Sequence, residues 1–74
     1  MGNAEKAVAY LQQALEIQRA LGARRDEVTT LRFLAISLRS LNRLDEARRQ
    51  IELAINIVEA SRADLINPQL RTAF

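Results

Sequence analysis

The sequence predicts an all-α protein in which antiparallel helices are joined by tight turns. Hydrophobic residues make up 49% of the 74-residue chain, and only two glycines and one proline interrupt it. Long segments therefore run without a helix breaker. Apolar residues also recur at alternating steps of three and four, which places them along one side of a helix. These observations predict three main helices and a short C-terminal helix.

The first helix is expected over residues 3–21. Asn3 is a plausible N-cap, because its side chain can accept a hydrogen bond from a free backbone N–H. Gly22 follows the last turn and can adopt the left-handed conformation that ends a helix. The expected core row is Ala4, Ala7, Leu11, Ala14, Gln18 and Leu21.

The second helix is expected over residues 26–41, with Asp26 as its N-cap. Asn42 tolerates a left-handed turn, and the short Asn42-Arg43 connection makes the second and third helices antiparallel neighbours. Phe33 and Ile36 lie off the core row and form a second apolar flank. The expected core row is Leu31, Leu34, Ala35, Leu38 and Leu41.

The third helix is expected over residues 44–62, with Leu53 and Ile57 as its second apolar flank. A helix that is apolar on more than one flank is expected to have neighbours on both sides. Asn67-Pro68 predicts a break, after which Pro68–Phe74 forms the short C-terminal helix. The expected core row is Leu44, Ala47, Ile51, Ala54, Val58 and Ser61.

Residues of the first helix recur in the third at a constant distance of 40 positions. Small residues match small residues, and branched residues match branched ones. A period of this length lies in the range of helical solenoids, so the fold class is an α-solenoid fragment built from a helix-turn-helix repeat. The matching pairs are Ala7–Ala47, Leu11–Ile51, Ala14–Ala54, Leu15–Ile55, Ile17–Ile57 and Ala20–Ala60.

The stretch from Leu31 to Val58 resembles a tetratricopeptide repeat. Its first helix carries the family's large and small positions at Leu31, Leu34, Ala35 and Leu38, and its second helix carries them at Ala47, Ile51 and Ala54. The resemblance implies three parts: residues 3–21 as the second helix of a partial repeat, residues 26–62 as one full repeat, and residues 63–74 as a C-terminal break and short helix.

Three positions depart from the common pattern of the family. Leu31 replaces the usual Trp, Asn42 replaces the turn glycine, and Glu59 stands where proline closes the repeat. Together with the longer period, these departures resemble the extended repeats of kinesin light chain-like proteins. Residues 58–71 also resemble the end of the repeat array in bacterial proteins that carry a caspase-like CHAT domain.

The resemblance implies a binding groove, because one side of a repeat's first helix lines the concave surface of the family. The expected occupant is an acidic or C-terminal peptide, or an adjacent domain. The alternative is an ordinary solvated helix face. Ile36 stands where the carboxylate clamp of chaperone-binding members needs an Asn, so that partner class is not expected. The candidate groove residues are Thr29, Arg32, Ile36, Arg39 and Arg43.

The composition argues against catalysis and cofactor binding, and against nucleic acid and membranes as partners. Histidine and cysteine are absent, so the usual base, thiol nucleophile and commonest metal ligands are missing, and neither an enzyme nor a cofactor is expected. The net charge is only +2 and the aromatic residues are Tyr10, Phe33 and Phe74, which disfavours nucleic acid. No apolar run approaches the ~18 residues of a membrane span, and no secretory signal is evident, so a cytoplasmic location is expected.

The sequence therefore predicts a non-catalytic scaffold for protein–protein interaction. A stand-alone helical dimerisation module is the alternative, and a helix-turn-helix DNA binder is a third possibility that rests on arginine content alone. Fewer than three repeats leave apolar faces open, so the isolated chain is expected to form a homo-oligomer. Candidates for open apolar surface are Tyr10, Leu53, Ile57 and Phe74.

Overall fold

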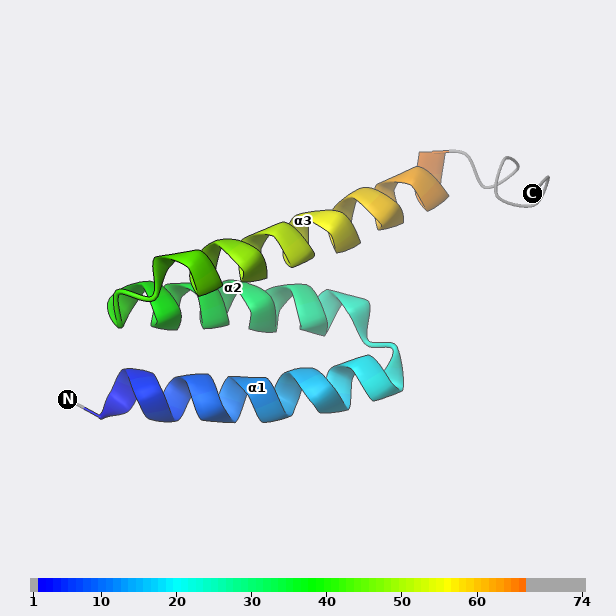
Figure 1. Ribbon diagram of the computed structural model, residues 1–74. Helices are drawn as coiled ribbons and strands as arrows, with labels where there is room; N and C mark the ends of the chain where they lie inside the picture. The colour runs from blue at the N-terminus through cyan, green and yellow to red at the C-terminus, as the bar shows by residue number, and fades with distance from the viewer. Residues whose placement is uncertain (1, 67–74) are drawn as a thin grey trace.

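A computed structural model describes residues 2–66 of the chain, with side chains described up to residue 63. It contains three helices, α1 (Asn3–Leu21), α2 (Arg24–Ser40) and α3 (Leu44–Ile66), as Figure 1 shows. The predicted all-α arrangement is confirmed. The short helix predicted over Pro68–Phe74 lies outside the described residues.

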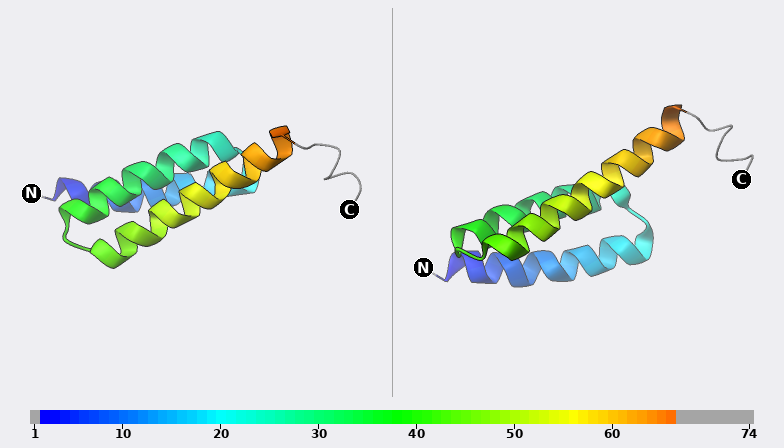
Figure 2. Two further views of the ribbon diagram at one scale, coloured as in Figure 1. Left: turned by 90° about the horizontal axis from the view of Figure 1, so that it is seen from above. Right: turned by 45° about the horizontal axis from the view of Figure 1, so that its top comes forward.

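The central helix is α2, which runs antiparallel to α1 on one side and to α3 on the other (Figures 1 and 2). In residues 2–66, both outer helices pack on α2 and make no contact with each other. The C-terminal part of α3 diverges from α2 (Figure 2). The helices therefore form an open row rather than a closed bundle.

The turn after α1 confirms the predicted role of Gly22. Its φ angle is 69°, in the left-handed region, where glycine carries no Cβ penalty. The backbone N–H of Ala23 donates to the Gln18 carbonyl at 2.9 Å, and that of Gly22 donates to the Arg19 carbonyl at 3.2 Å. These two bonds form a Schellman motif, which satisfies carbonyls at the end of α1.

Asn42 ends α2 in the same manner. Its φ angle is 62°, as expected for one of the few non-glycine residues that enter the left-handed region. The N–H of Arg43 donates to the Leu38 carbonyl at 2.9 Å, and that of Asn42 donates to the Arg39 carbonyl at 2.9 Å. Both reversals of the chain therefore use one backbone motif.

The predicted N-caps are wrong. Asn3 is already the first residue of α1, and neither Gly2 before α1 nor Ala23 before α2 makes a side-chain cap bond. The N–H of Glu27 donates to the Ala23 carbonyl at 2.9 Å, so α2 begins at Arg24 and places Asp26 inside its first turn. There the carboxylate still interacts favourably with the positive end of the helix dipole.

Two predicted C-termini also differ. Helix α2 ends at Ser40, with Leu41 as its C-cap. Helix α3 continues to Ile66, beyond the predicted end at residue 62, because no glycine or proline occurs before Pro68.

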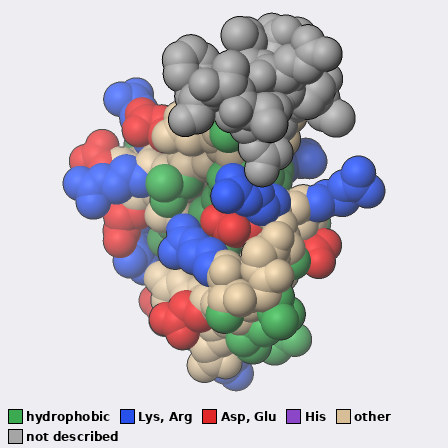
Figure 3. All heavy atoms as spheres, turned by 90° about the vertical axis from the view of Figure 1, so that its right-hand side faces the viewer, with side chains coloured by type: hydrophobic (Ala, Val, Ile, Leu, Met, Phe, Trp, Pro, Cys, Tyr) green, Lys and Arg blue, Asp and Glu red, His purple; other side chains and the backbone are tan. Residues whose placement is uncertain are grey.

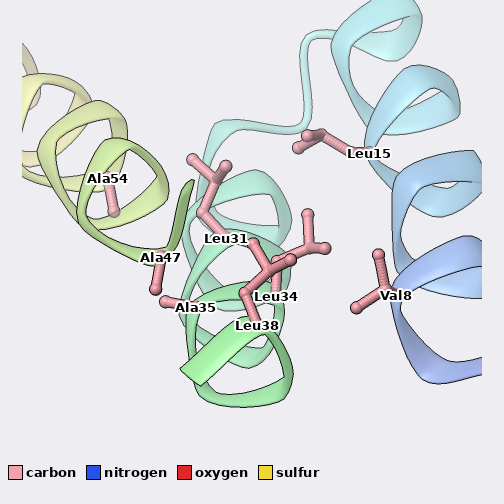
Figure 4. Close-up of a cluster of buried hydrophobic side chains, with 8 residues drawn as sticks. All are labelled: Val8, Leu15, Leu31, Leu34, Ala35, Leu38, Ala47 and Ala54. Carbon is pink, nitrogen blue, oxygen red and sulfur yellow. The ribbon is translucent and has the colours of Figure 1, made fainter. Parts of the chain in front are cut away.

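The hydrophobic core is centred on α2, whose Leu31 and Leu34 are 0% and 2% exposed. Figure 4 shows side chains of α1 and α3 pointing at α2 from opposite sides. The core row predicted for this helix is confirmed, with Leu41 partly buried at its end. The buried apolar residues are Val8, Leu15, Leu31, Leu34, Ala35, Leu38, Ala47 and Ala54.

The buried residues of α1 are not the members of the predicted core row but residues that follow two of those members by one position. Val8 and Leu15 are the buried residues, whereas Leu21 is 76% exposed. The other members of the predicted row are only partly buried, because α2 packs on the neighbouring side of α1 and leaves that row at the edge of the interface. Those members are Ala4, Ala7, Leu11, Ala14 and Gln18.

Only the small members of the core row predicted for α3 are buried. Ala47 and Ala54 are buried, but the larger Leu44, Ile51 and Val58 are 58%, 41% and 43% exposed. Ser61 is exposed as well. Helix α3 thus packs its small side chains on α2 and leaves its large ones at the edge of the contact.

Candidate interaction surface

A groove runs between α2 and α3, and we call it the α2–α3 groove. Its three stretches follow one another and share the lining residues Ile51, Val28, Val58 and Arg62. Apolar side chains form much of its lining, among them Val28, Ala35, Ile51, Ala54, Ile55 and Val58. Arginines from both helices border it, namely Arg24, Arg25, Arg32, Arg39, Arg48 and Arg62, with Glu59 as the one carboxylate among its described lining residues.

Three of the predicted site residues lie together in this groove. Arg32 lines its middle stretch, and Ile36 and Arg39 line the stretch near the α2–α3 turn. All three side chains are exposed, and Ile36 is 59% exposed. They therefore offer an apolar contact between two positive charges on one helix.

Thr29 lies at the opposite end of the groove, beside Arg24 and Arg25. Its hydroxyl donates a hydrogen bond to the Arg25 carbonyl at 3.2 Å. A threonine hydroxyl has one proton and two lone pairs, so its oxygen remains able to accept a hydrogen bond from a partner.

Arg43 lies outside the helices, in the turn between α2 and α3, and is already paired. Its Nη2 donates to Oε1 of Glu46 at 2.7 Å, and its Nε donates to Oε2 of the same carboxylate. The hydrogen bond to Glu46 raises the pKa of Arg43, and the reciprocal bond lowers the pKa of Glu46. Both groups face water, so the pair orders the turn more than it stabilises the fold.

The predicted site omitted the α3 side of the groove. Arg48, Ile51, Ile55, Val58 and Arg62 follow one another at steps of three and four, which is the spacing of one helix face. Ile51 and Val58 were assigned to the core row and Ile55 to the repeat, and neither arginine was assigned to a site. The shared helical spacing of these apolar and basic residues is the signal in the sequence that could have identified the α3 side of the groove.

A second hollow lies between α1 and α2, on the other side of α2. Tyr10 and Phe33 border it and are 73% and 55% exposed. Leu53 is 41% exposed, as predicted, whereas Ile57 packs partly against the core. Phe74 lies outside the described residues.

Charges of both signs occupy the end of the molecule where α2 begins. Basic side chains lie on both flanks of this end, with acidic side chains between them and hydrophobic atoms exposed (Figure 3). Within the described residues, no group of three or more His, Cys, Asp or Glu side chains could hold a metal ion. No helix among those same residues is long and apolar enough to cross a membrane.

Comparison with known proteins identifies the family. A family model described as tetratricopeptide repeat matches residues 1–60, a range that contains α1, α2 and most of α3. No curated protein and no solved structure gives a significant match. The matched range covers the antiparallel helices and both Schellman turns described above. The chain therefore belongs to the tetratricopeptide repeat family.

Proposed function

We propose that this chain is a non-catalytic scaffold that binds a peptide or an adjacent domain along the exposed side of α2. Tetratricopeptide repeats generally mediate protein–protein interaction. The observation that carries the proposal is the α2–α3 groove, in which apolar side chains are bordered by arginines. This combination suits a protein segment with both apolar and acidic residues.

The binding residues in this proposal are Thr29, Arg32, Ile36, Arg39 and Arg43. Arg32 and Arg39 would pair with carboxylates of the partner, and Ile36 between them would contact an apolar side chain. Thr29 would accept a hydrogen bond from the partner. Arg43 contributes least, because Glu46 already occupies its guanidinium.

The repeat boundaries form part of the same proposal. Residues 3–21 are the second helix of a partial repeat, residues 26–62 are one full repeat, and residues 63–74 are a C-terminal element. The period of 40 positions supports an extended repeat of the kinesin light chain-like type. The likeness of residues 58–71 to the end of arrays in CHAT-domain proteins and the cytoplasmic location also belong to this proposal.

The test is titration of the isotope-labelled chain with a flexible acidic peptide that ends in a free carboxylate, followed by NMR. We expect shift changes along α2, centred on Arg32 and Arg39. The double variant Arg32→Glu/Arg39→Glu should weaken binding by about tenfold or more. Arg49→Glu is the matched control, since Arg49 is exposed on α3 and is not among the residues that border the groove. An equal loss in both variants would indicate unspecific charge attraction and contradict the proposal.

The second candidate function is self-association of the isolated chain into a homo-oligomer, which the exposed side chains of Tyr10 and Phe33 favour. These aromatic side chains are exposed along one hollow between α1 and α2. A second copy that covered them would bury apolar area and stabilise a dimer. Sedimentation should then show a dimer that the Tyr10→Asp and Phe33→Asp variants dissociate, whereas a monomer at high micromolar concentration would contradict this function.

A further inference from the structure

The stretch of the α2–α3 groove beside the start of α2 is its most basic part, and we call it the basic end. Arg24 and Arg25 from α2 and Arg62 from α3 line it, and no carboxylate is among its described lining residues. The middle stretch has two arginines and Glu59, and the stretch beside the α2–α3 turn has two arginines. Three guanidinium groups from two helices therefore line one hollow.

The arginines of the basic end are exposed, and basic side chains are visible at this end of the molecule (Figure 3). Among the described side chains, the ion pairs are Arg19 with Glu27 and Arg43 with Glu46. Asp26 and Glu27 lie in the first turn of α2, but neither is a lining residue of the hollow. The three arginines therefore have no carboxylate partner in that part of the chain.

Three guanidinium groups suit a phosphate monoester better than a carboxylate. A phosphorylated side chain carries about −1.5 to −2 charges at neutral pH and three acceptor oxygens, whereas a carboxylate carries a single charge. Each planar guanidinium can donate two parallel hydrogen bonds to such oxygens. The Ser61 hydroxyl lines the same hollow and can donate another, while the Thr29 hydroxyl already donates to the Arg25 carbonyl.

The size and lining of the hollow fit more than a bare phosphate ion. Its volume is about 470 Å³, within the range of about 300–1,000 Å³ that is typical of ligand sites. Val28, Ile57 and Val58 form the apolar part of its lining. A ligand with a phosphate group beside an apolar group would therefore contact both parts.

The position of the hollow favours a protein as the source of the phosphate. Val28, Val58 and Arg62 also line the middle stretch, so a peptide in the groove would reach the basic end. The described lining residues include no aromatic side chain on which a nucleotide base could stack. Three arginines are also fewer than the clusters of about four to eight basic residues that bind anionic membranes.

We infer that the basic end binds a phosphorylated serine of a protein partner, whose phosphate group is held by Arg24, Arg25 and Arg62. This rests on the proposed scaffold function and adds a modified residue to the chemistry of the partner. Arg32 and Arg39 would pair with the carboxylates of the partner, so different arginines would recognise the phosphate. Phosphorylation of the partner would then increase its affinity for this chain.

The probes are three versions of the flexible acidic peptide, with serine, phosphoserine or glutamate at one central position. Binding of each labelled peptide to the 74-residue chain is followed by fluorescence anisotropy. We expect the phosphoserine peptide to bind about tenfold or more tightly than the serine peptide, and the glutamate peptide to gain much less. In NMR spectra, the shift changes should extend to Arg25 and Arg62 only with the phosphoserine peptide.

Two double variants separate the phosphate from the carboxylates. Arg25→Gln/Arg62→Gln should reduce the preference for phosphoserine over serine to about twofold or less. Arg32→Glu/Arg39→Glu should weaken binding of both peptides and keep that preference. Arg49→Gln is the charge control and should change either affinity by no more than about twofold. Circular dichroism establishes that the variants, all at exposed positions, keep their helices.

Several outcomes would overturn the inference. Equal affinity of the serine and phosphoserine peptides, or of the phosphoserine and glutamate peptides, would show that phosphate is not recognised, and the scaffold function would stand. An equal loss of the preference in Arg49→Gln would indicate unspecific charge attraction. Binding to vesicles that contain a phosphatidylinositol phosphate, without binding of the phosphoserine peptide, would assign the arginines to a membrane. Failure of every peptide would remove the scaffold function as well.

Discussion

The methyl groups of Ala35 on α2 and Ala47 on α3 point toward each other across the helix interface (Figure 4). Both residues are buried, at 5% and 8% exposure. Small side chains at such a point let two helix backbones approach closely. The close contact between α2 and α3 therefore depends on residues that lack bulk.

Replacement of Ala47 by leucine is expected to force α3 away from α2. Overpacking of this kind costs about 1–3 kcal/mol of unfolding free energy. Thermal and denaturant unfolding measure the loss. Ala60→Leu, an identical change at an exposed position of α3, should have little effect. Similar losses in the two variants would contradict this account of the interface.

Leu31 is the most deeply buried side chain of the chain's described part, at 0% exposure. Leu31→Ala should cost about 2–5 kcal/mol through lost apolar contact and a residual cavity. A domain of this size has only about 3–5 kcal/mol in total, so the variant should be largely unfolded by circular dichroism. Ile17→Ala, at a side chain that is 61% exposed, should cost less than about 1 kcal/mol.

Gly22→Ala tests the left-handed turn after α1. Apart from Gly22 and its two chain neighbours, no residue has an atom within 4 Å of the position that a Cβ would occupy, so the cost comes from the φ angle of 69°. We expect a loss of about 1 kcal/mol in chemical denaturation. At the second turn, Asn42→Ala should behave alike, whereas Asn42→Gly should be tolerated. A neutral Gly22→Ala would show that this turn does not restrain the fold.

Gln18 has a buried side-chain oxygen, Oε1, without a hydrogen-bond partner among the described residues. An unsatisfied buried acceptor destabilises the folded state, and its removal is favourable when the replacement has a similar shape. Gln18→Leu should therefore raise the unfolding free energy by about 1 kcal/mol. The exposed Gln12→Leu is the control, and a lower melting temperature for Gln18→Leu would refute the explanation.

The Arg43–Glu46 pair predicts a small dependence of stability on pH. Because the pKa of Glu46 is lowered from 4.5 in the folded state, its contribution is present above that value and is lost as the pH falls through the lowered pKa. The melting temperature of the wild type should thus fall more than that of Glu46→Gln between about pH 5 and about pH 3. The difference should shrink at high salt, since both groups are exposed. Parallel curves at low salt would mean that the pair contributes nothing.

The sequence predicted the helices and the core of α2 well, but not how α1 and α3 meet α2. The periodicity of Leu31, Leu34 and Leu38 is unambiguous, because these side chains are covered from both sides. Helices α1 and α3 are apolar over a wide arc, so spacing alone could not decide whether Val8 or Leu11 faces inward. That choice depends on the direction from which α2 approaches.

The candidate site was predicted on one helix, whereas the groove is formed by two. Arg32 and Arg39 could be assigned to a face from spacing within α2. Placing Arg48 in the same stretch of the groove as Arg39 required the relative rotation of α3, which the buried alanines set. The N-caps failed for another reason: backbone hydrogen bonds began each helix at a residue without a capping side chain.

The lack of contact between α1 and α3 in residues 2–66 gives α2 a particular mechanical role. Detachment of one outer helix would break only its own interface with α2, since no interface joins the first helix to the third in the described residues. Any influence of one outer helix on the other has to pass through the leucines of the middle one. The described helices are therefore held together by two separate interfaces, and α2 takes part in both.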